Sequence, residues 1–91
     1  MERAKIDAVF SRRFNGQPNP MTDTVIDRFE AHGLLWEIST GKFMDQWLGG
    51  VTVLTFDGED PPGKLNQCFG NVDRNEAIRL ARKYAENGGT L

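Results

Sequence analysis

The chain has one histidine and one cysteine, the two side chains that most readily support nucleophilic chemistry. A triad-type reaction needs a base such as His32 beside a nucleophile such as Cys68, with a third group that orients the base. Nothing in the sequence pairs these two residues. We expect His32 to close a helix, where an imidazole interacts favourably with the last carbonyls, and Cys68 to be a reduced packing residue. Structural zinc is excluded, because such a site needs more cysteine and histidine ligands than this chain contains.

Three carboxylates, Asp57, Glu59 and Asp60, form an acidic loop that could hold calcium or perform acid–base chemistry. The loop lacks the spaced oxygen ligands of an EF-hand, and an acidic turn before two prolines is typically solvated. The glycine pairs at residues 49–50 and 88–89 match neither a phosphate loop nor a dinucleotide fingerprint. The sequence therefore predicts no enzymatic activity, no metal and no cofactor.

Basic side chains gather on the exposed face of the last expected helix, at Arg79, Arg82 and Lys83. They could bind phosphate, which makes a DNA- or RNA-binding module the alternative function. From Thr22 onward the expected element order resembles that of double-stranded-RNA-binding domains, although residues 71–76 lack the lysines at the start of that family's last helix. Nucleic-acid-binding domains are normally basic, whereas this chain has a net charge of −2 and a pI of about 5.3.

Three large apolar side chains, Phe43, Met44 and Trp47, lie in a segment that does not fit one side of a single strand. Interface cores favour tryptophan, phenylalanine and methionine. We expect these residues and the acidic loop to contact the basic surface of a protein partner, such as a host protein that handles nucleic acid. The alternative that all three belong to the core stays open.

The first third of the chain predicts two helices. Apolar residues recur at helical spacing between Glu2 and Phe14, and residues 15–20 form a loop because they contain two prolines and a glycine. A second short helix is expected to begin near Thr22 and to end at Gly33.

The middle of the chain predicts strands. Residues 34–38 alternate in period two, residues 39–42 read as a turn, and residues 43–56 form an extended stretch. Gly49 and Gly50 interrupt that stretch as a bulge or a second turn, which leaves the sheet at three or four strands. A further strand is expected at residues 64–69.

The last helix has the best local evidence. Asp73 and Glu76 have the spacing of an N-terminal capping box, and the apolar residues that follow fill one arc of the helix. Gly88 and Gly89 stop it. We therefore expect a helix over residues 73–87 with one packed and one solvated face.

These elements give an α+β fold of order α-α-β-β-β-α, with an antiparallel sheet and the helices packed on one face. With 91 residues, 38% of them hydrophobic and 26% charged, the chain is one globular domain (1–91), of which residues 1–20 are a peripheral helix and loop. No apolar stretch could span a membrane and no signal peptide opens the chain, so we expect a cytoplasmic protein, monomeric or a homodimer. The predicted function is that of a small binding protein, a regulator or a phage or mobile-element inhibitor of a host defence protein.

Overall fold

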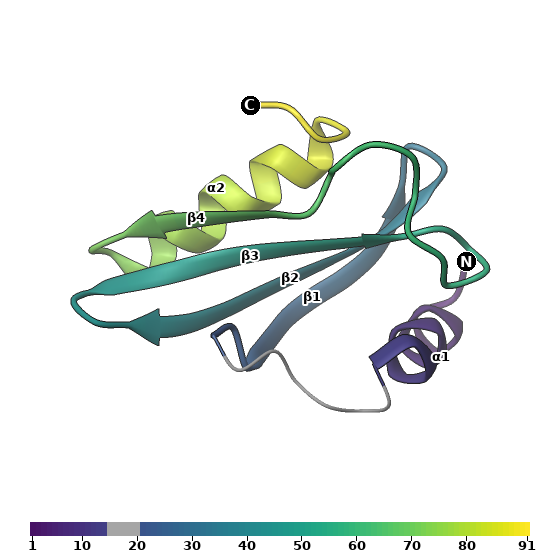
Figure 1. Ribbon diagram of the computed structural model, residues 1–91, viewed down its shortest axis with the longest axis horizontal. Helices are drawn as coiled ribbons and strands as arrows, with labels where there is room; N and C mark the ends of the chain where they lie inside the picture. The colour runs from purple at the N-terminus through teal and green to yellow at the C-terminus, as the bar shows by residue number, and fades with distance from the viewer. Residues whose placement is uncertain (15–20) are drawn as a thin grey trace.

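The computed structural model of the chain describes residues 1–14 and 21–91, so the predicted loop at residues 15–20 lies outside it. Two helices flank four strands (Figure 1). The elements are α1 (Arg3–Phe14), β1 (Thr24–Ala31), β2 (Leu34–Phe43), β3 (Gln46–Leu54), β4 (Gln67–Asn71) and α2 (Arg74–Glu86). The strands form one antiparallel sheet in the order β1-β2-β3-β4. The α+β class and the antiparallel sheet are confirmed, and the sheet has four strands.

The second predicted helix is wrong, because residues 24–31 form the edge strand β1. A bulge between Val25 and Asp27 shifts the register against β2. It places Ile26 and Phe29 together against the same core cluster. Inward side chains three residues apart imitate helical spacing, which is why the segment reads as a helix. The element order is therefore α-β-β-β-β-α, which also removes the resemblance to double-stranded-RNA-binding domains.

The turn predicted at residues 39–42 is also wrong, because β2 continues to Phe43 and the turn lies at Met44 and Asp45. Ser39 and Thr40 are buried, and the Thr40 hydroxyl donates to the Leu48 carbonyl at 2.7 Å. A Cβ on Gly41 would lie 2.0 Å from the carbonyl oxygen of Met21. Gly41 is needed because the chain at Met21 crosses directly over this face of β2, the face to which Ser39 also points.

The glycine pair at 49–50 is neither a bulge nor a turn, since β3 runs through it in regular register with β2 and β4. A Cβ on Gly49 would lie 2.0 Å from the Ala77 carbonyl oxygen, so this glycine lets α2 approach the sheet. The strand predicted at residues 64–69 lies later, at Gln67–Asn71. Leu65 still packs against the core.

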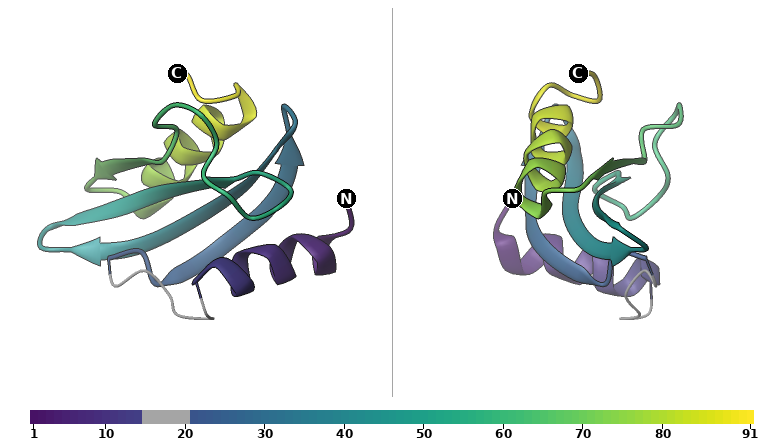
Figure 2. Two further views of the ribbon diagram at one scale, coloured as in Figure 1. Left: turned by 45° about the vertical axis from the view of Figure 1, so that its right-hand side comes forward. Right: turned by 90° about the vertical axis from the view of Figure 1, so that its left-hand side faces the viewer.

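The two helices cover opposite faces of the sheet, so the expectation that they share one face is wrong. Trp36, Ile38, Val51 and Val53 point toward α2, whereas Leu35 and Leu54 pack with Ile6, Val9 and Phe10 of α1. Successive residues of a strand point to opposite faces, so the buried neighbours Leu35 and Trp36 belong to different cores. The left-hand view of Figure 2 shows α1 beside β1 and apart from α2.

The bounds of α2 and its N-cap are confirmed, but the reciprocal bond of the predicted capping box is not, because the Asp73 amide donates to Asn71 Oδ1 at 2.9 Å while Glu76 binds Arg79. Asp73 is the N-cap, and its carboxylate accepts from the Asn75 amide at 3.0 Å. Beyond the C-cap Asn87, Gly88 and Gly89 take φ values of 76° and 102°, and the Gly89 amide donates to the Tyr84 carbonyl. Neither described helix has the length and apolar character needed to cross a membrane.

The contact between Gly49 and α2 generates a stability prediction. Gly49→Ala is expected to lower the free energy of unfolding by about 2–3 kcal/mol or more, because backbone atoms of Ala77 would have to move. Gly70→Ala is the matched control, since the one close contact of its Cβ would be with the far end of the Gln46 side chain, and it should cost below about 1 kcal/mol. Urea unfolding of both variants measures the difference, and equal losses would contradict the close approach.

Candidate binding surface

Exposed apolar side chains lie around the end of the β2–β3 hairpin, beside the start of α2. They are not all on one face, because the register directs Trp47 to the α2 side of the sheet and Phe43 to the other side. Phe43 and Met44 lie at the hairpin tip, Trp47 pairs in register with Asn71, and Val72 follows directly. Met44 is 81% exposed, Val72 76% and Phe43 47%. We call Phe43, Met44, Trp47 and Val72 the tip surface. The open question of whether the first three belong to the core is answered for Phe43 and Met44, which are exposed, while Trp47 is half-buried.

Met44 occupies a backbone conformation that its residue type rarely adopts. Its φ is 57°, in the left-handed region, where a side chain other than glycine, asparagine or aspartate costs roughly 1–2 kcal/mol. Two-residue hairpin turns normally use asparagine or glycine at such positions. The sequence thus places a strained, solvent-exposed methionine where a better turn former would fit.

Trp47 lies between two cations. Lys42 Nζ is 5.8 Å and Arg74 Cζ 5.7 Å from its ring centroid, both within cation–π range. These contacts hold the indole at the surface end of the sheet, on the side of α2. The hairpin register brings Lys42 opposite Trp47, and the helix start supplies Arg74.

Val72 and Arg74 are not predicted as exposed neighbours of Trp47 from the sequence, and the reason is physical. An apolar residue directly before an N-cap normally packs on the fourth helical residue, here Ala77, which would bury it. Val72 instead stays exposed. The clue in the sequence is the capping aspartate Asp73, which fixes Val72 and Arg74 on either side of the strand-to-helix turn.

The structure does not bring the acidic loop to the tip surface. Asp57, Glu59 and Asp60 follow Leu54, which pairs with Leu35 at the other end of the β2–β3 hairpin from Phe43. Figure 1 shows this loop and the hairpin tip at opposite ends of the molecule. Asp60 forms an ion pair with Arg13 of α1 at 3.0 Å and lines a hollow of about 400 Å³ beside Lys64. The two predicted sets of protein-binding residues therefore form separate surfaces.

The basic face of α2 is largely paired with carboxylates. Arg79 binds Glu76 on its own helix, and Arg82 donates to Asp27 of β1 at 2.9 Å. The hydrogen bond from Arg79 also lowers the pKa of Glu76. Among the described residues, Lys83 alone of the three predicted contacts forms no ion pair.

Asp27 links the two helices across the edge of the sheet. Its carboxylate accepts from Arg82 of α2 and from Arg3 of α1, both at 2.9 Å. Arg3 and Arg28 also bind Asp7, and their hydrogen bonds lower the pKa of that carboxyl. Arg82 is thus a structural contact that ties α2 to β1.

His32 and Cys68 do not meet. His32 lies in the β1–β2 turn, not at the end of a helix of its own, and its Nε2 is 2.7 Å from the carbonyl oxygen of Glu86. It therefore contacts the last turn of α2, a helix distant in sequence. Within residues 1–14 and 21–91 no three histidine, cysteine or acidic side chains form a group that could hold a metal.

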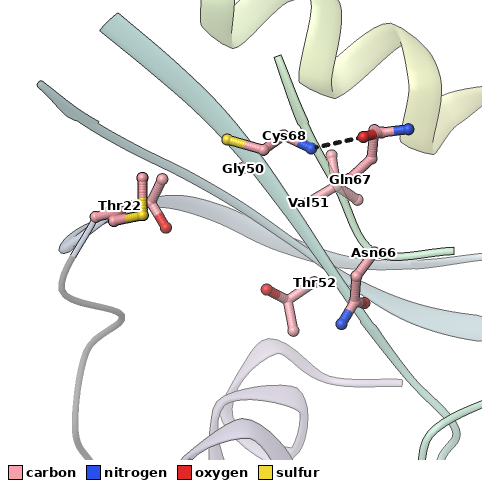
Figure 3. Close-up of a pocket in the computed structure, with 8 residues that line it drawn as sticks. Thr22, Gly50, Val51, Thr52, Asn66, Gln67 and Cys68 are labelled. Atoms are coloured by element: carbon pink, nitrogen blue, oxygen red, sulfur yellow. Dashed lines mark hydrogen bonds between the residues drawn. The ribbon is translucent and has the colours of Figure 1, made fainter. Parts of the chain in front are cut away.

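Cys68 lines a groove of about 430 Å³ on the sheet face away from α2 (Figure 3). Its thiol points across the groove toward Thr22, and the floor is formed by Gly50 and Thr52. Burial raises the pKa of this thiol above its ordinary value. A raised thiol pKa lowers the thiolate fraction at neutral pH, so Cys68 is a poor nucleophile in this setting.

Alkylation by iodoacetamide tests this environment. The rate at Cys68 should rise with pH through a midpoint higher than that of the same chain unfolded in urea, because folding disfavours the thiolate. The unfolded chain is the matched control, since it has the same single thiol. A midpoint at lower pH in the folded chain would show an activated cysteine and contradict this description.

Scans against protein-family models, curated proteins and solved structures each find no match for the chain. Its function is therefore inferred from its own residues.

Proposed function

We propose that this protein is a small non-catalytic binding protein whose tip surface contacts a protein partner. The observation that carries the proposal is Met44, which is strained in its backbone and 81% exposed in its side chain. A residue that costs folding energy and gains no burial in the isolated chain is typical of a functional contact.

The surroundings of Met44 suit a protein partner. Methionine is flexible and polarisable and adapts to apolar pockets, while tryptophan and arginine are enriched among residues that dominate binding energies. Phe43 adds exposed apolar area on the other face of the hairpin, and Val72 is exposed directly after β4. Lys42 and Arg74 supply positive charge around Trp47. The partner is expected to present an apolar pocket for Met44 with carboxylates near the cations.

A protein of this kind acts by occupying a surface of its target, as regulators and inhibitors do. Its size and chemistry are those of accessory proteins that phages and mobile elements direct against host defence proteins. This association rests on size and chemistry and not on a motif. The separation of the acidic loop from the tip surface changes the expected target. The tip surface is expected to contact an apolar pocket of the target. A basic surface of the target would instead have to meet the acidic loop at the other end of the molecule.

DNA or RNA binding through Arg79, Arg82 and Lys83 is the alternative. The ion pairs of Arg79 and Arg82 count against it, because phosphate would have to displace carboxylates already in place. Reversing Arg79 and Lys83 tests this alternative. Arg82 is left unchanged because it holds Asp27.

Met44→Asn separates binding from folding. Asparagine tolerates the left-handed backbone, so the free energy of unfolding should stay the same or rise by up to about 1 kcal/mol. Affinity for the partner should fall about tenfold, because an apolar anchor worth roughly 1–2 kcal/mol is lost. The partner is first captured from nuclease-treated host lysate by a chain carrying a photoreactive methionine analogue at position 44, and the dissociation constant is then measured.

His32→Asn is the matched control, since His32 is, besides Met44, the non-glycine residue with positive φ in the described part of the chain, and it lies at the opposite end of the sheet. It should leave affinity unchanged. Capture that disappears on nuclease treatment, or that is lost when Arg79 and Lys83 are reversed, would support the nucleic-acid alternative. Wild-type affinity of both Met44→Asn and Trp47→Ala would refute the tip surface as the contact.

A further inference from the structure

β4 is an edge strand of the sheet, and no strand within residues 1–14 and 21–91 pairs with its outer side. The Cys68 amide donates to its neighbour's side chain, Gln67 Oε1, at 3.1 Å. In an antiparallel strand the amide and carbonyl of one residue point the same way, and this direction alternates along the chain. Cys68 and Gly70 therefore direct their backbone groups away from β3, at the free edge of the sheet.

The two edges of the sheet are protected very differently. β1 carries a bulge and the charged residues Asp27, Arg28 and Glu30, and ion pairs from Arg3 and from the Met1 amino group cover it. Bulges and charges are the usual devices that stop edge strands from pairing. β4, with the sequence QCFGN, has no charge, no proline and no bulge in its pairing with β3.

The side of α2 that lies above β4 has an acid and a base on either side of an apolar residue, so it could pack against the same side of a second copy. Arg82 points toward β1, and Leu80 lies about 160° around the helix from it, on the side of β4. Leu80 is half-buried, as is Phe69 of β4. Glu76 and Lys83 lie one turn before and one turn after Leu80 on this flank, so it carries one acid and one base around an apolar centre.

We propose that β4 pairs antiparallel with β4 of a second copy of this chain, about a two-fold axis through Phe69. Cys68 then lies opposite Gly70 of the second copy, and the two resulting pairs each exchange two backbone hydrogen bonds. On pairing, the Cys68 amide gives up its hydrogen bond to the Gln67 side chain and donates instead to the backbone carbonyl of Gly70 in the second copy. Gly70 has no side chain, which leaves room for the Cys68 thiol on the open face.

The same axis brings the two α2 helices together in opposite directions. Phe69 and Leu80 meet their own counterparts and lose their remaining exposure to water. Glu76 of each copy approaches Lys83 of the other, so two opposite-charge pairs form at once. A two-fold interface must be self-complementary in this way, whereas an unrelated partner strand would have no reason to match the flank of α2.

The pairing has a consequence for binding. Asn71 lies at the end of β4 beside the hairpin tip, so antiparallel pairing places the two tip surfaces at opposite ends of one continuous sheet twice as wide. The dimer would be a bivalent binder, and two tips engaging a repetitive or dimeric target would gain avidity. The pairing itself does not depend on what the tip surface binds.

Sedimentation analysis of the purified chain over a concentration series tests the proposal. The mass should double by a concentration on the order of 1 mM. Cys68→Pro should raise the dissociation constant at least about tenfold, because it removes an outward amide without touching the bonds to β3. Cys68→Ala is the matched control and should dimerise normally.

A charge exchange tests the helix flank without changing the strand. Lys83→Glu should weaken the dimer about threefold to tenfold, and the double variant Glu76→Lys, Lys83→Glu should restore it. Thermal melts show whether each variant is folded. A chain that stays monomeric throughout, a dimer that survives in folded Cys68→Pro, or a charge exchange that does not restore dimerisation would each overturn the proposal. Met44→Asn should leave the dimer intact, so failure here is distinct from failure of the tip surface.

Discussion

Burial of β2 on both faces is the constraint on which the rest of this structure depends. Leu35 and Trp36 are adjacent and fully buried, yet a strand directs neighbouring side chains to opposite sides. One helix cannot cover both. α2 covers the Trp36 side and α1 the Leu35 side, so a chain of this size is built as three layers rather than two.

The α1 face of the sheet is covered by α1 at one end and by the chain at Met21 further along. Small residues occur where that chain passes close to the sheet. α1 packs with Leu35 and Leu54 at one end of the sheet, whereas the chain at Met21 crosses β2 further along. Under that crossing the sheet presents Ser39, Gly41 and Gly50, because larger side chains would collide with the crossing chain or with each other. The groove beside Cys68 is the space that these residues leave open.

Sequence reasoning succeeded where the cause of structure is local. The capping aspartate Asp73, the apolar arc and the terminal glycines define α2 within its own residues. It failed where distant segments decide, at the β1 bulge and at β2 beneath Met21. The expectation that a strand could not bury Phe43 and Met44 on one side agrees with their exposure. The cap at Asp73 places Val72 and Arg74 at the start of α2, but their position beside Trp47 depends on the register of β4 against β3, which no local pattern contains.

The two hairpin turns show why the tip surface differs from ordinary exposed residues. His32 and Met44 have φ values of 55° and 57°, so both carry left-handed strain. His32 is compensated, because its ring packs against Gly88 and reaches the Glu86 carbonyl at the end of α2. Met44 is 81% exposed at the far end of the same hairpin strand and gains no comparable burial. The positive-φ residue at one end of β2 is thus packed within the fold, whereas the one at the other end is left exposed, and this difference is the ground for proposing Met44 as a contact.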